Sequence, residues 1–373
     1  MNLISVFFPL ILLAVAGAVA FYFTPQKSIS FAERGVYTLS ENEYSLRVYT
    51  DENNSNLDFG MSSRPLLIIL PPAFGSLPVI DETACELRDR GFTVIACDSR
   101  SGLLEQFRRG HTFFSGSVYA GANKKGRLLE EKRKKDAQFV LSWIKNNPRI
   151  EGTTRLFDLA SKDNIFIAGY DASGSALILS EASLFRNITI SGMIAIEAPL
   201  WSLYRSAADI IPDISASAAV NAGWFQSVKL GVKRWYVELM PNKISDLEQI
   251  PRVSTPILFL VSDWSRDPKF SNTRYKALLG CFAAAQNYAV LATEDGAGPL
   301  GFSDFPIHYP LVTTILKGRL ESRFKPTRSN FEIPWRTAAT ITNFAASVLS
   351  AREGTSWPLR NSTLPAGVQV KTK

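Results

Sequence analysis

The chain has 373 residues, of which 46% are hydrophobic, 11% aromatic and 20% charged. This composition excludes an intrinsically disordered chain, a fibrous repeat and a polar linker, and it allows two or three domains or one large domain. The formal net charge is +7, but Lys and Arg are interspersed with 34 Asp and Glu, so no nucleic-acid partner is predicted.

The amino terminus begins with an uncharged apolar run over residues 3–23. As a helix this run would be about 30 Å long, which matches the hydrocarbon core of a bilayer. The aromatic cluster at residues 21–23 suits the membrane interface and favours a retained membrane anchor. The small residues Ala16, Ala18 and Ala20 support the alternative, a signal peptide whose cleavage yields a secreted protein. We expect the domain that follows to be extracytoplasmic.

Strand and helix patterns alternate along the rest of the chain. Residues 44–49 alternate in polarity and predict an edge hairpin, whereas the unbroken apolar run 66–70 predicts a strand buried on both faces. Further strands are predicted at 92–97, 164–168, 192–196, 256–262 and 288–291, and helices at 78–90, 130–147, 272–285 and 335–351. This alternation predicts the α/β class, with a mostly parallel central sheet flanked by helices.

A basic cluster lies near the start of the helix predicted at 130–147. Lys and Arg, Arg133 among them, are frequent over residues 124–135, which suggests an anion-binding or membrane-surface patch. Glu130 and Asp136 are interleaved with these cations, and such a mixture of signs is typical of a solvated helix face. We adopt the solvated face as the prediction.

The stretch 200–250 interrupts the alternation with helix-like, aromatic-rich segments. We predict a helical cap over a pocket; the alternative is a helical excursion that packs on the sheet. The predicted organisation is an N-terminal membrane anchor or signal peptide (1–24), a first part of the core (25–199), the cap-like insertion (200–250), a second part of the core (251–352) and a C-terminal tail (353–373).

The three cysteines, Cys85, Cys97 and Cys281, are an odd number without paired spacing. Such a set excludes a disulfide framework and a cysteine-ligated zinc finger. We therefore predict neither a metal nor any other cofactor.

The segment 165–175 runs from a buried strand directly into a helix through small residues. Gly169, Asp171 and Ser173 occupy the positions of a Gly-x-nucleophile-x-small pattern, in which small residues let the chain turn sharply. Such a nucleophile elbow exposes its central side chain at the carboxyl end of the strand, with a helix amino terminus behind it. We therefore predict that Asp171 is presented to an active site.

Four segments resemble, in their order along the chain, the strand and helix signatures of the α/β-hydrolase superfamily, and among its members most resemble dienelactone hydrolases and related esterases. They are 66–75 (LLIILPPAFG), 86–98 (ELRDRGFTVIACD), 136–143 (DAQFVLSW) and 164–174 (NIFIAGYDASG). The resemblance implies an α/β-hydrolase fold from residue 64 to residue 351. It also implies an eight-stranded, mostly parallel sheet with a Ser, Cys or Asp nucleophile, an acid after the seventh strand and a histidine after the eighth.

The same resemblance assigns an oxyanion hole to two backbone amides. One belongs to Ala172, next to the predicted nucleophile, and the other belongs to the loop after residue 70. Pro71 and Pro72 have no N–H group, so the first available donor in that loop is Ala73.

The resemblance gives Asp267 as the catalytic acid, with Asp263 in reserve, although either residue also suits a helix cap. The base is harder to place, because Pro299 stands where the family has histidine. The two histidines, His111 and His308, both follow predicted strands. We take His308 as the candidate base, with the chain before the last helix folding back; a surface or capping role is the alternative.

An aspartate nucleophile favours attack on saturated carbon, as in the haloalkane dehalogenases and epoxide hydrolases that this Gly-x-Asp elbow resembles. We predict a hydrolase that acts on a small or medium apolar molecule through Asp171, with Asp267 and His308 as helpers. Ser173 and Ser175 are the alternative nucleophiles. The alternative function is a catalytically degenerate scaffold that binds a ligand or partner without turnover, because the elbow lacks serine and the expected histidine is missing.

Overall fold

The computed structural model describes residues 35–41, 43–50, 64–72, 77–99, 122–203, 250–262, 272–297, 302, 332–352 and 364–373. The predicted anchor (1–24) lies outside these ranges, as does the predicted cap (200–250) apart from residues 200–203 and 250. No helix within the described ranges combines the length and the apolar character that a bilayer span requires.

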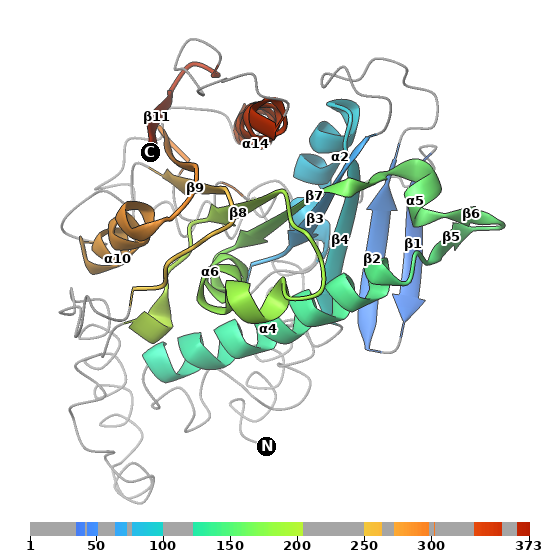
Figure 1. The fold of residues 1–373 in the computed structure, drawn as a ribbon, viewed down its shortest axis with the longest axis horizontal. Coiled ribbons are helices and arrows are strands. Elements are labelled where there is room, and N and C mark those ends of the chain that lie inside the picture. Colours follow the sequence, from blue (N-terminus) through green and yellow to red (C-terminus); the bar gives the residue numbers. More distant parts are fainter. Residues whose placement is uncertain are drawn as a thin grey trace, which may run out of the picture.

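Nine strands of the described ranges form one sheet, in the order β1-β2-β4-β3-β7-β8-β9-β10-β11 (Figure 1). They are β1 (Val36–Glu41), β2 (Tyr44–Tyr49), β3 (Pro65–Leu70), β4 (Thr93–Ser99), β7 (Ser161–Tyr170), β8 (Gly192–Ile196), β9 (Ile257–Ser262), β10 (Ala289–Glu294) and β11 (Val368–Thr372). Neighbouring strands from β4 to β10 are parallel, and the antiparallel pairs lie at the two edges. The mostly parallel sheet and the edge hairpin are therefore confirmed.

The strand β11 was not predicted from the sequence. It lies in the stretch assigned to the C-terminal tail and pairs antiparallel with β10, from Val290↔Thr372 to Glu294↔Val368. Its sequence, VQVKT, alternates apolar and polar residues over a length too short to distinguish it from a loop. Within the described residues the sheet thus has one strand more than the resemblance implies.

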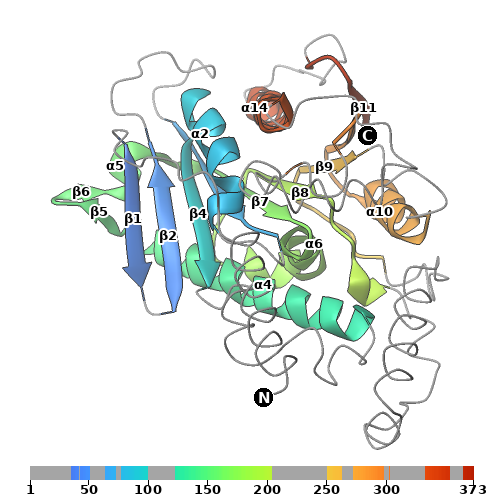
Figure 2. The same ribbon diagram turned by 180° about the vertical axis from the view of Figure 1, so that it is seen from behind.

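Helices cover both faces of the sheet. They are η1 (Leu77–Ile80), α2 (Asp81–Asp89), α4 (Ala122–Lys145), α5 (Leu156–Leu159), α6 (Ala172–Leu184), η3 (Trp201–Leu203), α10 (Asn272–Ala284) and α14 (Glu332–Arg352), and a separate ribbon joins β5 (Arg149–Glu151) to β6 (Thr154–Arg155). α4 and α6 pack together on one face, and α2 and α14 pack together on the other (Figure 1 and Figure 2). The described chain is therefore a three-layer α/β/α arrangement.

Alternate side chains of the central strands enter two different cores. In β3, Leu66, Ile68 and Leu70 belong to the core that includes α4 and α6, whereas Leu67 and Ile69 belong to the core that includes α2 and α14. None of these five side chains is more than 4% exposed. Burial of each contributes about 1.5–3 kcal/mol, which explains why a strand between two helical layers has an unbroken apolar sequence.

The prediction of a solvated face on α4 is wrong for three charged residues. Glu130, Arg133 and Asp136 are only 3%, 1% and 1% exposed. Arg133 forms ion pairs with Asp98 of β4 and with Asp136, so its charge is neutralised inside the fold rather than by water. The mixture of charges on this helix therefore reflects internal pairing.

Candidate active site

Asp171 lies at a sharp turn between the central strand β7 and helix α6. Its backbone has φ 55° and ψ −122°. This left-handed conformation favours glycine and costs other residues about 1–3 kcal/mol. β7 ends at Tyr170 and α6 begins at Ala172, so the turn is made within one residue. The sharp turn predicted at this position is present.

Gly169 is required because α6 starts directly against the end of β7. A Cβ at Gly169 would lie 2.5 Å from the backbone carbon of Ser173 and 2.7 Å from its backbone oxygen. A Cβ at Gly174 would lie 2.7 Å from the carbonyl oxygen of Gly169. These contacts involve backbone atoms, so rotation of a side chain does not relieve them. The small residues of the pattern thus meet a steric requirement of the turn.

Backbone hydrogen bonds hold Asp171 at the carboxyl end of the parallel strands. Its N–H donates to the carbonyl of Ile196 in β8 (2.8 Å), and its carbonyl accepts from the N–H of Ser175 in α6 (3.1 Å). The first bond links the turn to the sheet, and the second belongs to the first turn of the helix. The residue is half-buried. Asp171 therefore lies at the edge where open α/β sheets bind their ligands.

The two alternative serine nucleophiles are buried and hold the backbone. Ser173 Oγ donates to the carbonyl oxygen of Pro71 (2.6 Å), and Ser175 Oγ accepts from the N–H of Leu200 (2.8 Å). Both residues are 0% exposed. Within residues 169–175, all of which the structure describes, Asp171 is therefore the nucleophilic side chain with access to solvent.

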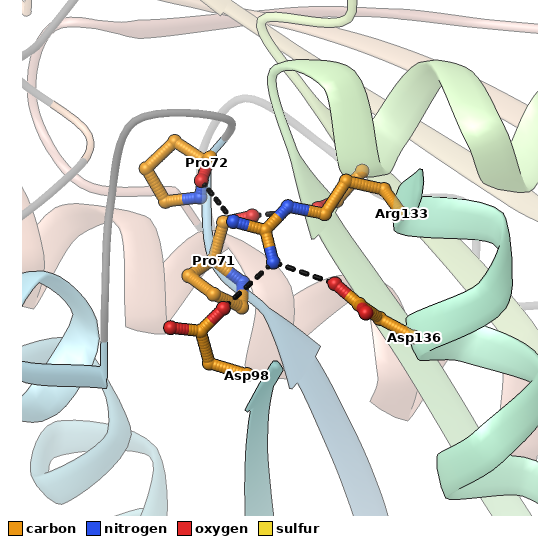
Figure 3. A network of polar contacts seen from close by, with 6 residues as sticks. Pro71, Pro72, Asp98, Arg133 and Asp136 are labelled. Atoms are coloured by element: carbon orange, nitrogen blue, oxygen red, sulfur yellow. Dashed lines mark hydrogen bonds and ion pairs between the residues drawn. The ribbon is translucent and has the colours of Figure 1, made fainter. Parts of the chain in front are cut away.

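The start of the loop after β3 is held by a buried guanidinium, which Figure 3 shows reaching from α4 to three oxygen atoms. Arg133 Nη2 donates to the carbonyl oxygen of Pro72 (2.7 Å). Its Nη1 donates to Asp98 Oδ1 (2.8 Å) and to Asp136 Oδ2 (2.7 Å). Hydrogen bonds from a charged donor are about twice as strong as neutral ones. The loop that begins at Pro71 and Pro72 is therefore tied to α4 and β4.

The electrostatics of this cluster keep Arg133 charged. Burial alone would lower the pKa of the guanidinium, but the charges and hydrogen bonds of Asp98 and Asp136 outweigh burial and raise that pKa. Burial raises the pKa of the Asp98 carboxyl, and the charge of Arg133 opposes the rise only in part. The neighbouring Lys132 has a pKa lowered by burial and by the charge of Arg133.

A carboxylate that the sequence analysis missed lies beside the elbow. Glu197 follows β8 directly, and the register of β7 with β8 places it next to Asp171. Its φ is 50°, and its Oε1 accepts a hydrogen bond from the N–H of Ser262 at the end of β9. The sequence does contain a signal for it, because the strand predicted at 192–196 ends one residue before this acid. Residues in that position lie at the carboxyl edge of a parallel sheet.

A second buried arginine holds the chain that follows β10, where the resemblance expects the histidine loop. Arg336 of α14 donates to the carbonyl oxygens of Asp295 (3.2 Å) and Ala366 (2.6 Å). Its Nη1 lies 3.5 Å from Glu294 Oε1, and the two side chains are 2% and 0% exposed. Buried arginines thus hold backbone carbonyls after β3 and after β10.

The structure places two of the predicted site residues, Asp171 and Ala172, together at the end of the central strand. Ala172 is the first residue of α6, and N–H groups in the first turn of a helix have no acceptor within the helix. Ala73, Asp267 and His308 lie outside the described residues, as do Asp263, Pro299 and His111. The roles assigned to them stay predictions.

The described ranges contain no group of three His, Cys, Asp or Glu side chains that could hold a metal ion. Cys85, Cys97 and Cys281 are free thiols. Burial raises the pKa of Cys85 and of Cys281 to about 12, so both are protonated near neutral pH.

Comparisons with known proteins give matches among solved structures. No protein-family model and no curated protein matches the chain. A ferulic acid esterase from Streptomyces cinnamoneus is similar at a TM-score of 0.51 and 13% identity, over 91% of this chain and 97% of the esterase. An esterase from Pyrobaculum calidifontis has a TM-score of 0.44 at 16% identity, over 88% of this chain and 89% of that one.

Brefeldin A esterase, a bacterial homologue of human hormone sensitive lipase, has a TM-score of 0.43 at 15% identity, over 90% of this chain and 84% of its own. The similarity to the Streptomyces enzyme spans nearly the whole of both chains. The chain has the α/β-hydrolase fold. The finer resemblance to dienelactone hydrolases stays a prediction.

Proposed function

We propose that the chain is a hydrolase that uses the carboxylate of Asp171 as its nucleophile and acts on a small or medium apolar molecule. The observation that carries the proposal is the elbow, because a strained backbone is usually retained where function needs it. Burial of Ser173 and Ser175 removes the competing nucleophiles. The similarity of fold supports hydrolysis only as an analogy. The residues of the site determine which reaction is catalysed.

In the first step, one carboxylate oxygen of Asp171 attacks a saturated carbon of the substrate. A carbon–oxygen bond forms, the bond to the leaving group breaks, and the leaving group departs with the electron pair. The product is an alkyl ester of the enzyme.

In the second step, water attacks the carbonyl carbon of this ester, and an oxyanion forms. The oxyanion collapses, the bond to the alkyl oxygen breaks, and the alkyl oxygen takes up one proton of the water and leaves as an alcohol. The second proton is released, and the Asp171 carboxylate is restored. The sum is the exchange of the leaving group for hydroxide.

We assign the second step to four helpers. The N–H groups of Ala172 and Ala73 stabilise the oxyanion, His308 takes the proton from the attacking water, and Asp267 orients the histidine. Support for Ala172 comes from its place at the amino terminus of α6, where the helix dipole favours negative charge. The roles of Ala73, His308 and Asp267 rest on the sequence resemblance alone.

Ester cleavage is not the reaction we propose, although the structural neighbours are named as esterases. A carboxylate that attacks an ester forms an acid anhydride instead of the acyl-enzyme that a serine forms. Attack on saturated carbon gives an ester, which water then hydrolyses. Alkyl halides are therefore a substrate class that Asp171 suits. Epoxides are a second class, but their ring oxygen stays attached to the product and must take up a proton when the ring opens, so the net reaction there is the addition of water.

Covalent labelling tests the proposal. The protein is incubated with short-chain alkyl halides and epoxides, quenched, and analysed by intact and peptide mass spectrometry. We expect the mass of the alkyl group on the peptide that contains Asp171, and we expect no shift in Asp171→Asn. Asp163→Asn, which changes an exposed carboxylate in the same strand, is the matched control and keeps the shift. Absence of a shift in the wild-type protein contradicts the proposal.

The alternative function is a degenerate scaffold that binds a ligand or partner without turnover, and Pro299 at the expected base position favours it. Hydrolysis that is lost in both Asp171→Ala and His308→Ala excludes this alternative. Ligand binding without release of any product supports it.

We propose further that residues 3–23 anchor the protein in a membrane, with the catalytic domain extracytoplasmic. The support is the uncharged apolar run and its aromatic end. We expect the full chain in the carbonate-washed membrane fraction, digestion of its catalytic domain by protease added outside intact cells, and a chain that lacks residues 1–24 in the soluble fraction. Release of a shortened chain into the medium supports the alternative, secretion after signal cleavage.

A further inference from the structure

The chain that leaves β8 lies against the elbow. The N–H of Asp171 donates to the carbonyl of Ile196 (2.8 Å), so the next residue, Glu197, lies beside Asp171 at the carboxyl end of the sheet. One residue further, the chain meets the first turn of α6, because a Cβ at Gly174 would lie 3.2 Å from the Cβ of Ala198. Adjacent strands of a sheet are about 4.8 Å apart. Asp171 and Glu197 are therefore adjacent acidic residues on one edge.

The carboxylate of Glu197 is held at the end of β9. The backbone N–H of Glu197 donates to the carbonyl of Leu260 (2.9 Å), and its Oε1 accepts from the N–H of Ser262, the last residue of β9. Ser262 is 0% exposed, so water does not compete for this bond, whereas Glu197 is half-buried. The sheet thus fixes this carboxylate at a partly exposed position.

The backbone at this corner is strained. Among the described residues, four non-glycine residues have a positive φ. Three of them, Asp171 (55°), Glu197 (50°) and Leu200 (53°), lie in the two segments that leave β7 and β8. A hydrogen bond to β9 does not require such a backbone, because Glu181 makes the same kind of bond at the start of β9 from within the regular helix α6. Strain that the fold itself does not need is usually retained for function.

Hydrolysis of the ester on Asp171 needs a water molecule that is oriented toward the ester carbonyl. Water has two O–H groups, and the base takes the proton of one of them. We propose that Glu197 is a further catalytic residue, whose carboxylate accepts a hydrogen bond from the other O–H group and so orients the attacking water. This second hydrogen stays on the oxygen that adds to the carbonyl carbon, and it is released when the Asp171 carboxylate is restored. The inference rests on the function proposed above.

The spacing of the strands suits this role. A hydrogen bond of about 2.8 Å from water to Glu197, followed by an approach of about 3.2 Å from the water oxygen to the ester carbon, spans about 6 Å. Side chains on strand ends about 4.8 Å apart come within this range. The carboxylate is already ordered by the bond from Ser262, so little entropy is lost when it binds the water.

A single turnover with butyl bromide tests the role. Formation of the butyl ester at Asp171 and its hydrolysis are followed separately, by quenching and mass spectrometry. Glu197→Gln keeps the length of the side chain and an oxygen for the N–H of Ser262, but it replaces the charged acceptor with an amide. We expect hydrolysis of the ester to be slower by about tenfold to a hundredfold, so that the ester accumulates. Formation of the ester should stay within about threefold of the wild type, because that step uses no water.

Glu181→Gln is the matched control. Glu181 is 7% exposed and accepts hydrogen bonds from the N–H groups of Ser254 (2.9 Å) and Thr255 (2.6 Å), just before β9. It therefore holds the start of β9 as Glu197 holds its end, about 20 Å away along a strand of six residues. We expect both chemical steps to keep their wild-type rates in this variant.

Added hydroxylamine separates catalysis from distortion of the site. Its nitrogen attacks the carbonyl carbon of the ester, a carbon–nitrogen bond forms, and the bond to the alkyl oxygen breaks. The alkyl oxygen takes up a proton and leaves as butanol, and Asp171 becomes a hydroxamate. Hydroxylamine is a stronger nucleophile than water and does not need Glu197 for its orientation. We therefore expect it to remove the accumulated ester from Glu197→Gln, with the mass of the hydroxamate on the peptide that contains Asp171.

Four results overturn the proposal: hydrolysis at the wild-type rate in Glu197→Gln, equal slowing of both steps, an accumulated ester that hydroxylamine does not remove, or an ester that the wild type itself does not hydrolyse. Glu197→Asn, which tolerates a left-handed φ, replaces Glu197→Gln if that variant does not fold, and the same results are expected. If the wild type forms no ester, the function proposed above fails, and the role of Glu197 falls with it. If the wild type forms and hydrolyses the ester but Glu197→Gln does so equally well, the role of Glu197 alone fails.

Discussion

The backbone conformation of Asp171 predicts that glycine is more stable than alanine at this position. Asp171→Gly and Asp171→Ala both remove the carboxylate, so the two variants differ only in the Cβ. At φ 55° and ψ −122° the Cβ costs about 1–3 kcal/mol, which glycine avoids. Glycine loses about 0.4–1 kcal/mol more backbone entropy on folding than alanine does. The difference between these two terms favours Asp171→Gly by about 0–2.6 kcal/mol in the free energy of unfolding, with a midpoint of about 1.3 kcal/mol.

Urea denaturation followed by circular dichroism measures this difference, provided that the two variants have the same m value. Gln138→Gly and Gln138→Ala form the matched control pair, because Gln138 is exposed in the interior of α4. There alanine should be more stable than glycine by about 1 kcal/mol. The expected result is therefore an opposite sign of the glycine–alanine difference at positions 171 and 138.

The same sign at both positions refutes the reasoning. A residue in a regular helix or strand prefers alanine to glycine. Greater stability of Asp171→Ala would therefore mean that the chain does not turn at Asp171, and the carboxylate would lose its place at the edge of the sheet.

Three further predictions concern the surroundings of the elbow and the buried groups. Gly169→Ala brings a Cβ within 2.5 Å of the Ser173 backbone and should lower the free energy of unfolding by about 3 kcal/mol. In the control Gly152→Ala the new Cβ meets no atom within 4 Å, so the free energy of unfolding should fall by only about 1–2 kcal/mol, because of the positive φ. Equal losses for the two variants in urea denaturation would contradict the close contact at Gly169. The raised pKa of Cys281, about 12, should make its alkylation in the folded protein slower than in urea by more than about a hundredfold, and equal labelling rates by mass spectrometry would contradict burial. Folding raises the pKa of the Asp98 carboxyl above its ordinary value of 3.8, so the protonated carboxyl stabilises the fold below that pH. This stabilisation is lost as the pH rises through the pKa that Asp98 has in the folded protein. Asp98→Asn should remove this decrease from a plot of the free energy of unfolding against pH, and identical slopes for Asp98→Asn and the wild type would contradict the prediction.

The central strands could be predicted from the sequence because their burial is local information. A strand between two helical layers needs an unbroken apolar run, and residues 66–70 provide one. β11 could not be predicted in the same way, because Val368–Thr372 is a short edge strand in which only Val368 is buried. It is held by the distant β10, and the sequence around it does not indicate that partner.

The elbow could be predicted for a related reason. Gly169 and Gly174 lie within five residues of each other, and their small size meets a steric need of the same turn. The role of Arg133 could not be predicted, because its partners Pro72 and Asp98 are 61 and 35 residues away. A helix with mixed charges has the same sequence pattern whether its cations face water or buried carboxylates.

A single turnover in water labelled with heavy oxygen tests the central claim most directly. If Asp171 is the nucleophile, the alcohol takes its oxygen from the carboxylate, and the heavy oxygen of water enters Asp171 when the ester is hydrolysed. The proposed reaction predicts an unlabelled alcohol and one heavy oxygen in the peptide that contains Asp171. A labelled alcohol together with an unlabelled Asp171 would show that water attacks the substrate directly, and this result would contradict the carboxylate mechanism.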